Sequence, residues 1–112
     1  MNCNKLTEAL RGFTLLLSLE FSVELDSGNC ALIMNLTDGE AKGAKSISAE
    51  FSGVSNLRIE DFGGGMTQLL LLVVEDIRDK QLDRLNYQIR ELERNSISFM
   101  CRTAIIKGTE HS

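Results

Sequence analysis

The feature that most constrains this chain is an alternation of apolar residues with mostly polar ones between Phe13 and Leu25. Seven apolar residues occupy consecutive odd positions: Phe13, Leu15, Leu17, Leu19, Phe21, Val23 and Leu25. Successive side chains of a β-strand point to opposite faces of a sheet. A period of two over this length therefore predicts a long strand, with one face in the core and the later half of the other face in solvent.

The sequence around this strand predicts further strands joined by turns. Glycine marks most of these turns, because proline is absent. A short helix over residues 4–11, capped by Asn4, is expected before the strand. A turn is expected at 26–29 and an exposed loop at 38–45. Three further strands are expected after the turn, and their inward residues are, in chain order, Cys30, Leu32, Met34 and Leu36, then Ile47, Ala49 and Phe51, then Leu57 and Ile59.

The longest purely apolar run, Leu69–Val74, follows the glycines at 63–65. Six apolar residues without alternation predict a central strand that is buried on both faces. Such a strand needs cover on its second face from a helix, a second sheet or another subunit. The glycine triplet itself predicts a tight turn, because it lacks the Lys-Ser/Thr pair of a phosphate-binding loop.

Residues 76–94 have two interpretations. Leu82, Leu85, Ile89 and Leu92 have helical spacing, which predicts one helix of about five turns. The alternative is a short helix over 78–85, followed by a hairpin with strands near 86–93 and 97–106.

The segment from Asp76 to Cys101 resembles a set of small uncharacterised bacterial proteins that are similar to immunity proteins carried near toxin genes. Those proteins contain a D-I-x-x-x-Q-L segment that leads into Y-x-V-x-x-x-E-x-x-x-I-S-F-x-C. The matching residues here are Asp76, Ile77, Gln81, Leu82, Tyr87, Ile89, Glu93, Ile97, Ser98, Phe99 and Cys101. The upstream stretch FSGVSNLRIEDFGG is also similar, so the resemblance covers about the last 60 residues. It implies paired strands, which favours the hairpin, and it implies no known chemistry.

The predicted fold class is α+β, a predominantly antiparallel sheet of five to seven strands with one or two short helices. With 112 residues, of which 43% are apolar, residues 1–112 are expected to form a single domain.

The net charge of −4 disfavours nucleic acid as a partner, because an acidic chain repels phosphates. The acidic excess lies in residues 1–62, which contain five basic and nine acidic residues. No segment is apolar enough to span a membrane. Three widely spaced cysteines and no signal peptide indicate the cytoplasm.

No residue is predicted to be catalytic, to bind a cofactor or to bind a metal. The single histidine, His111, lies next to the end of the sequence. Cys30 and Cys101 are expected to be buried and inert, and Cys3 exposed. The carboxylates of Glu60, Asp61, Glu75 and Asp76 are the remaining candidates for chemistry. Their favoured interpretation is structural, with Asp76 as a helix cap.

These observations favour a non-catalytic protein-binding module that is immunity-like. The alternative is a small-ligand-binding domain with an apolar pocket between sheet and helix, and a carboxylate-based enzyme is the least favoured. The expected partner is another protein or a second copy of the chain. A homodimer would cover the run Leu69–Val74 and the back of the first hairpin, at Leu16 and Ile33.

Overall fold

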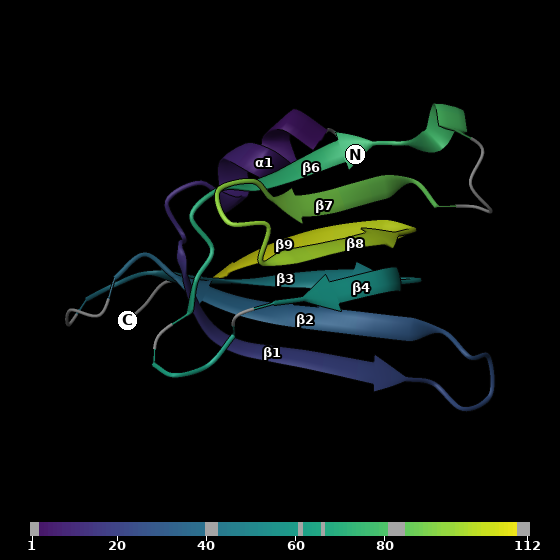
Figure 1. The fold of residues 1–112 in the computed structure, drawn as a ribbon, viewed down its shortest axis with the longest axis horizontal. Coiled ribbons are helices and arrows are strands. Elements are labelled where there is room, and N and C mark those ends of the chain that lie inside the picture. Colours follow the sequence, from purple (N-terminus) through teal and green to yellow (C-terminus); the bar gives the residue numbers. More distant parts are fainter. Residues whose placement is uncertain (1–2, 40–42, 61, 66, 81–84, 110–112) are drawn as a thin grey trace.

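The computed structural model describes residues 3–39, 43–60, 62–65, 67–80 and 85–109. This part of the chain contains one α-helix, one 3-10 helix and nine strands (Figure 1). They are α1 (Cys3–Leu10), β1 (Leu15–Val23), β2 (Cys30–Thr37), β3 (Ser46–Ser52), β4 (Ser55–Ile59), β5 (Thr67–Gln68), β6 (Leu72–Asp76), η1 (Arg78–Lys80), β7 (Tyr87–Glu91), β8 (Ile97–Cys101) and β9 (Thr103–Thr109). The predicted class, α+β with mainly antiparallel strands, is confirmed.

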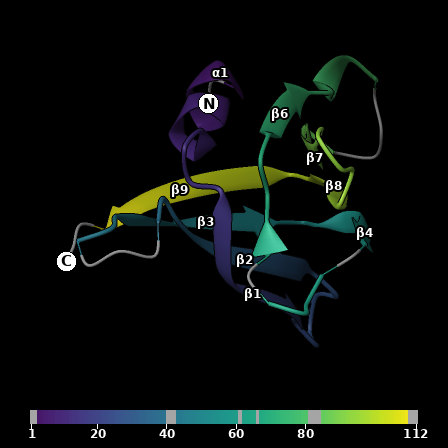
Figure 2. The same ribbon diagram turned by 60° about the vertical axis from the view of Figure 1, so that its left-hand side comes forward.

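The strands form two antiparallel sheets instead of the single sheet that the sequence predicts. The larger sheet has the order β5-β1-β2-β3-β9, and the smaller sheet has the order β4-β8-β7-β6. Figure 2 shows the smaller sheet and α1 on the same side of the larger sheet. The apolar interior between these layers is the core of the protein.

Alternating inward side chains from both sheets fill this core. In β2, Leu32, Met34 and Leu36 are fully buried, as the sequence predicts. The rings of Phe51 and Phe99 meet edge to face, with centroids 4.8 Å apart. This geometry is favourable for aromatic pairs, and it joins β3 of the larger sheet to β8 of the smaller one.

The two sheets are connected through a folded ribbon. β3 pairs with β9 and β4 pairs with β8, so residues 46–59 and 97–109 form one antiparallel ribbon that bends at a corner. Gly53 lies at this corner with a φ of +67°, and a Cβ there would come within 2.7 Å of the Arg102 Cγ. The close approach of the two strands therefore requires glycine. The amide of Arg102 donates a hydrogen bond to the carbonyl of Ser52 across the bend (2.9 Å).

Helix α1 covers the free edge of β6. Leu6 and Leu10 are buried on its inner side, as the helical spacing predicts. The helix begins at Cys3, so Asn4 lies in its first turn and not at the cap. The Thr7 Oγ1 accepts a hydrogen bond from the Val74 amide (3.0 Å), which satisfies a backbone donor at the edge of the sheet.

The prediction of one strand over Leu69–Val74 is wrong. β5 ends at Gln68 in the larger sheet and β6 begins at Leu72 in the smaller one, so the intervening residues lead from one sheet to the other. Leu69 is buried, whereas Leu70 is 41% exposed. The segment lacks alternation because it changes sheets, and its last residues, which belong to β6, are covered by α1 in the same chain.

The hairpin interpretation is confirmed by β7 and β8, which pair from Tyr87–Cys101 to Arg90–Ser98. The long helix over 76–94 is therefore wrong: among the residues with helical spacing, Ile89 is a buried residue of β7 opposite Phe99 of β8, and Leu92 is exposed in the turn that follows β7. The single second strand predicted over 97–106 is wrong, because the chain bends at Arg102 and continues as β9 in the larger sheet. Only η1, at Arg78–Lys80, remains of the short helix, and residues 81–84 lie outside the described part of the chain. Residues 40–42 of the predicted loop also lie outside it.

Candidate protein-binding surface

One side of β1 is open. Towards β2 the strand is paired from Leu15 to Val23, but towards β5 only at Leu15 and Leu16. From Ser18 to Val23, no residue in the described part of the chain pairs with this outer side. Alternate N–H and C=O groups of an unpaired strand point away from the sheet, where another strand can bind them. We call residues Leu17–Leu25, which contain this stretch, the β1 edge.

The β1 edge exposes apolar side chains. The exposed fraction is 53% for Leu17, 45% for Phe21, 52% for Val23 and 95% for Leu25. Phe21 lies opposite Leu32, so both side chains point to the inner face of the larger sheet. Leu32 is fully buried, but Phe21 is not, because β1 lies beyond β4, the last strand of the smaller sheet (Figure 1). The prediction that the odd positions between 13 and 25 face the core is therefore wrong at Leu17 and from Phe21 onwards.

A β-bulge contributes to this exposure. The register of β1 against β2 shifts between Leu16 and Ser18, so Leu17 has no direct partner in β2. A bulge re-aims the side chains that follow it and increases the local twist. The sequence carries one sign of this shift, because Leu15, Leu16 and Leu17 are three consecutive apolar residues at the position of the bulge.

The charged residues within the stretch 17–26 are all negative. Glu20 lies on the outer face of β1, and Glu24 and Asp26 follow at its end. Within the described residues none of these three carboxylates has an ion-pair partner, and Glu24 only accepts a hydrogen bond from Ser27. The surface therefore combines unpaired backbone, apolar side chains and uncompensated negative charge.

The other sheet edges differ from the β1 edge. The outer strand β9 carries one large exposed apolar side chain, Ile105, and its Lys107 pairs with Glu50 (3.0 Å). The outer strand β4 is interrupted by a register shift and by Asn56, which has a φ of 56°. Charges and irregular pairing are the usual protections of a sheet edge.

The predicted acidic candidates do not come together. β4 and β6 are separated by β8 and β7 and run in opposite directions. Glu60 follows β4 at one end of the smaller sheet, whereas Glu75 and Asp76 are at the other end. Asp61 lies outside the described residues. A joint acid–base pair from both groups is therefore not formed among the described carboxylates.

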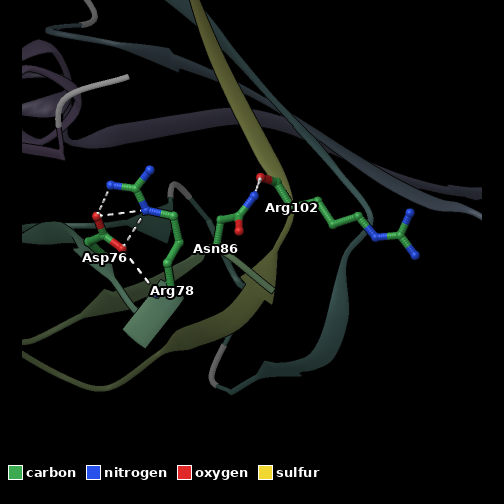
Figure 3. A network of polar contacts seen from close by, with 4 residues as sticks. All are labelled: Asp76, Arg78, Asn86 and Arg102. Carbon is green, nitrogen blue, oxygen red and sulfur yellow. Dashed lines mark hydrogen bonds and ion pairs between the residues drawn. The ribbon is translucent and has the colours of Figure 1, made fainter. Parts of the chain in front are cut away.

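Glu75 and Asp76 are each occupied by an arginine. Glu75 pairs with Arg90 on the neighbouring strand β7. Both oxygens of Asp76 accept hydrogen bonds from Arg78, whose backbone amide also donates to Asp76 at 3.0 Å (Figure 3). The side-chain hydrogen bond, followed by the backbone one, lowers the pKa of Asp76. Asp76 therefore holds the start of η1, in agreement with its predicted capping role.

The neighbouring polar contact fixes the corner between the sheets. The Asn86 amide nitrogen donates to the carbonyl oxygen of Arg102 (2.8 Å), while the guanidinium group of Arg102 points away from this network (Figure 3). The contact holds Asn86, the residue that precedes β7 in the chain, against the bend between β8 and β9. Its role is structural.

A buried carboxylate that the sequence analysis missed is Glu91, which is 1% exposed. Its oxygens accept hydrogen bonds from the amides of Leu71 (3.2 Å), Glu93 (3.1 Å) and Arg94 (2.8 Å). Burial acts to raise its pKa, but the backbone hydrogen bonds outweigh burial and the pKa is lowered. Its position two residues after Ile89, in the inward phase of β7, was the available signal.

Other candidates for chemistry are inert or outside the described residues. Cys101 is fully buried, and burial raises its pKa to about 12, which keeps the thiol protonated. Cys30 is half-buried, and Cys3 packs against the core, contrary to the predicted exposure. His111 lies outside the described part. Within that part, no group of three or more His, Cys, Asp or Glu residues is placed to hold a metal.

Three pockets are candidates for a small ligand. One, of about 230 Å³, lies at the corner between the sheets and includes Ser27, Asn29 and Arg102. A second, of about 380 Å³, lies on the outer face of the smaller sheet, and a third lies at Asp76, Arg78 and Asp79. None of these three lies between a sheet and α1, where the sequence predicted an apolar pocket. Among the described helices, none is long and apolar enough to cross a bilayer.

The fold and its surface define a small antiparallel β protein whose most distinctive feature is an open, apolar and acidic sheet edge. The chain belongs to the immunity protein PIM8 family, whose model matches residues 2–107. This match confirms the resemblance to immunity proteins and extends it over nearly the whole chain. Comparisons with curated proteins and with solved structures give no match.

Proposed function

We propose that this chain is a bacterial immunity protein that acts in the cytoplasm and neutralises a toxin by binding it without catalysis. Membership of the immunity protein PIM8 family carries this proposal. The β1 edge supports it, because an apolar patch combined with unpaired backbone is typical of a protein interaction site.

The state of the candidate catalytic groups supports a non-catalytic role. Two of the candidate carboxylates are engaged by arginines, at the opposite end of the sheet from Glu60. The thiol of Cys101 is protonated and buried. The small-ligand alternative has less support, because polar side chains line the corner pocket and typical ligand sites are mostly apolar.

The cytoplasmic location is part of the proposal. The three cysteines are an odd number and are free in the structure. Free thiols are typical of a reducing compartment.

Self-association stays a prediction. Its main argument was that Leu69–Val74 needs cover, and α1 supplies this cover within one chain. A second copy would therefore have to bind at another surface. Light scattering at micromolar concentrations measures the mass directly, and a value of two chains supports the homodimer.

Co-expression tests the proposed function. The neighbouring genes are searched for a toxin-like reading frame, and its toxin domain is expressed in a bacterial host with or without this chain. We expect growth arrest by the toxin domain alone and restored growth with the chain. A toxin domain from an unrelated system is the control and should stay lethal. Restored growth without a complex between the purified proteins would contradict neutralisation by binding, and continued arrest would contradict the proposed function itself.

A further inference from the structure

We infer that the toxin adds a β-strand to the β1 edge, through an extended segment in which basic side chains alternate with apolar ones. This inference rests on the proposed function, and it assigns the binding surface and the chemistry of the partner segment. It follows from three properties of the β1 edge, which concern its backbone, its two faces and its charge.

The backbone provides the first property. The pairing of β1 with β5 stops at Leu16, so the larger sheet lacks a neighbour beside Ser18–Val23 within the described residues. The missing neighbour has the length of an average strand, about five to six residues. A partner strand placed there would continue the line of β5 and would satisfy the outward N–H and C=O groups of β1.

The two faces of β1 determine the side-chain pattern of the partner. Phe21 and Val23 point to the inner face, where they lie opposite Leu32 and Cys30. Glu20 points to the outer face, opposite Ile33. Directly opposed side chains of paired strands interact, so an added strand should place apolar residues against Phe21 and Val23 and a basic residue against Glu20.

The charge decides between a toxin strand and a second copy of this chain. Antiparallel pairing of Ser18–Val23 with itself would place the Glu20 carboxylates of both copies on the same face, opposite or diagonal to each other. Glu24 and Asp26 would add further negative charge at both ends. Like charges opposite each other destabilise strand pairs, and the stretch 17–26 contains no basic residue to compensate. A basic partner segment relieves this repulsion.

A lysine on the apolar face of the β1 edge tests the location of the site. Val23→Lys places a charge where an apolar contact is expected, and we expect binding to the toxin domain to weaken by at least about 30-fold, as for a residue that carries much of the binding energy. Ile105→Lys is the matched control, since Ile105 is 47% exposed on the other outer strand of the same sheet. Its affinity should stay within about threefold. Thermal unfolding of both variants shows whether they fold.

Charge reversal tests the chemistry of the partner. Glu20→Lys should weaken binding and reduce the dependence of the affinity on salt, because it removes attraction to a basic segment. Glu93→Lys makes the same change in the exposed turn between β7 and β8 and should leave the affinity unchanged. Affinities that do not fall as salt rises for the unaltered chain would overturn the basic partner segment.

Amide hydrogen exchange tests strand addition itself. We expect the amides of Ser18–Val23 that point away from β2 to become protected when the unaltered chain binds the toxin domain. Toxin binding that leaves their exchange unchanged, or that survives Val23→Lys in a folded protein, overturns the inference while the proposed function stands. Absence of any toxin binding by the unaltered chain overturns the proposed function. A dimer of the free chain that Val23→Lys dissociates would show that a second copy occupies the edge, and this also overturns the inference.

Discussion

Two outer strands of this protein, β6 and β1, differ in how their edges are completed. At β6 the chain covers its own edge, because α1 packs against the strand and Thr7 accepts a hydrogen bond from the Val74 amide. At β1 the only described neighbour on the outer side stops after two residue pairs. Val74 is 5% exposed, whereas Val23 is 52% exposed.

The difference shows that similar strand residues can serve stability at one edge and recognition at another. Buried apolar surface contributes to the folded state of the free chain. Exposed apolar surface contributes only when a partner covers it. The comparison therefore predicts that changes at the β6 edge alter stability, while the same changes at the β1 edge alter binding.

The largest expected effect is at the contact between α1 and β6. Leu10 is 3% exposed, and Leu10→Ala should lower the free energy of unfolding by about 2–5 kcal/mol, the usual cost of a buried leucine truncated to alanine. Leu25→Ala, at a position that is 95% exposed, is the control and should change it by less than about 0.5 kcal/mol. Chemical denaturation measures both. Equal effects would remove the contrast between the edges.

The next effect is at Glu91, which holds the chain before β6 through the amide of Leu71. Glu91→Gln should cost about 1.5–3 kcal/mol, because it removes the charge that strengthens the hydrogen bonds from three backbone amides. Glu93→Gln, in the exposed turn, is the control. A fully stable Glu91→Gln variant would show that the charge of Glu91 does not stabilise the fold.

Glu91 also predicts a pH dependence. Its pKa is lower in the folded state than its ordinary value of 4.5, so its contribution to stability is complete above that ordinary value. The contribution is lost as the pH falls through the lower folded pKa. The stability difference between the unaltered chain and Glu91→Gln should therefore shrink in acid. Denaturation at a series of pH values measures it, and a difference that grows in acid would contradict the direction of the shift.

A smaller effect is expected at Thr7. Thr7→Val keeps the shape of the side chain but removes the acceptor for the Val74 amide, at a cost of about 1 kcal/mol. Thr7→Ser keeps the hydroxyl and is the control for the hydrogen bond. Exchange of the Val74 amide should become faster in Thr7→Val only. An unchanged exchange rate would mean that packing alone protects this edge.

The smallest effect on stability is expected at the β1 edge. Val23→Lys should change the free energy of unfolding by less than about 0.5 kcal/mol, because the side chain is already half exposed. Val74→Lys, the same change at the covered edge, would bury a charge and should prevent stable folding. A large loss of stability in Val23→Lys would place the β1 edge within the core instead of at a binding surface.

Much of the local structure followed from the sequence. The alternation in residues 30–36 and 47–51 predicted β2 and β3 and their inward side chains, because a strand of a two-layer fold buries every second residue. The helical spacing of Leu6 and Leu10 predicted the buried side of α1. Of the candidate surface, the sequence indicated the acidic charge and the apolar residues of β1, but not that they were exposed.

The sequence by itself determined the class of the fold, the strands with regular alternation and the excess of negative charge near β1. Only the tertiary structure decided that Leu69–Val74 passes between two sheets, that Glu91 is buried and that Phe21 and Val23 have no cover. Periodicity records which residues share a face of a strand. Whether that face is covered depends on the reach of a second layer from distant parts of the chain, and here the smaller sheet ends at β4, before it reaches β1.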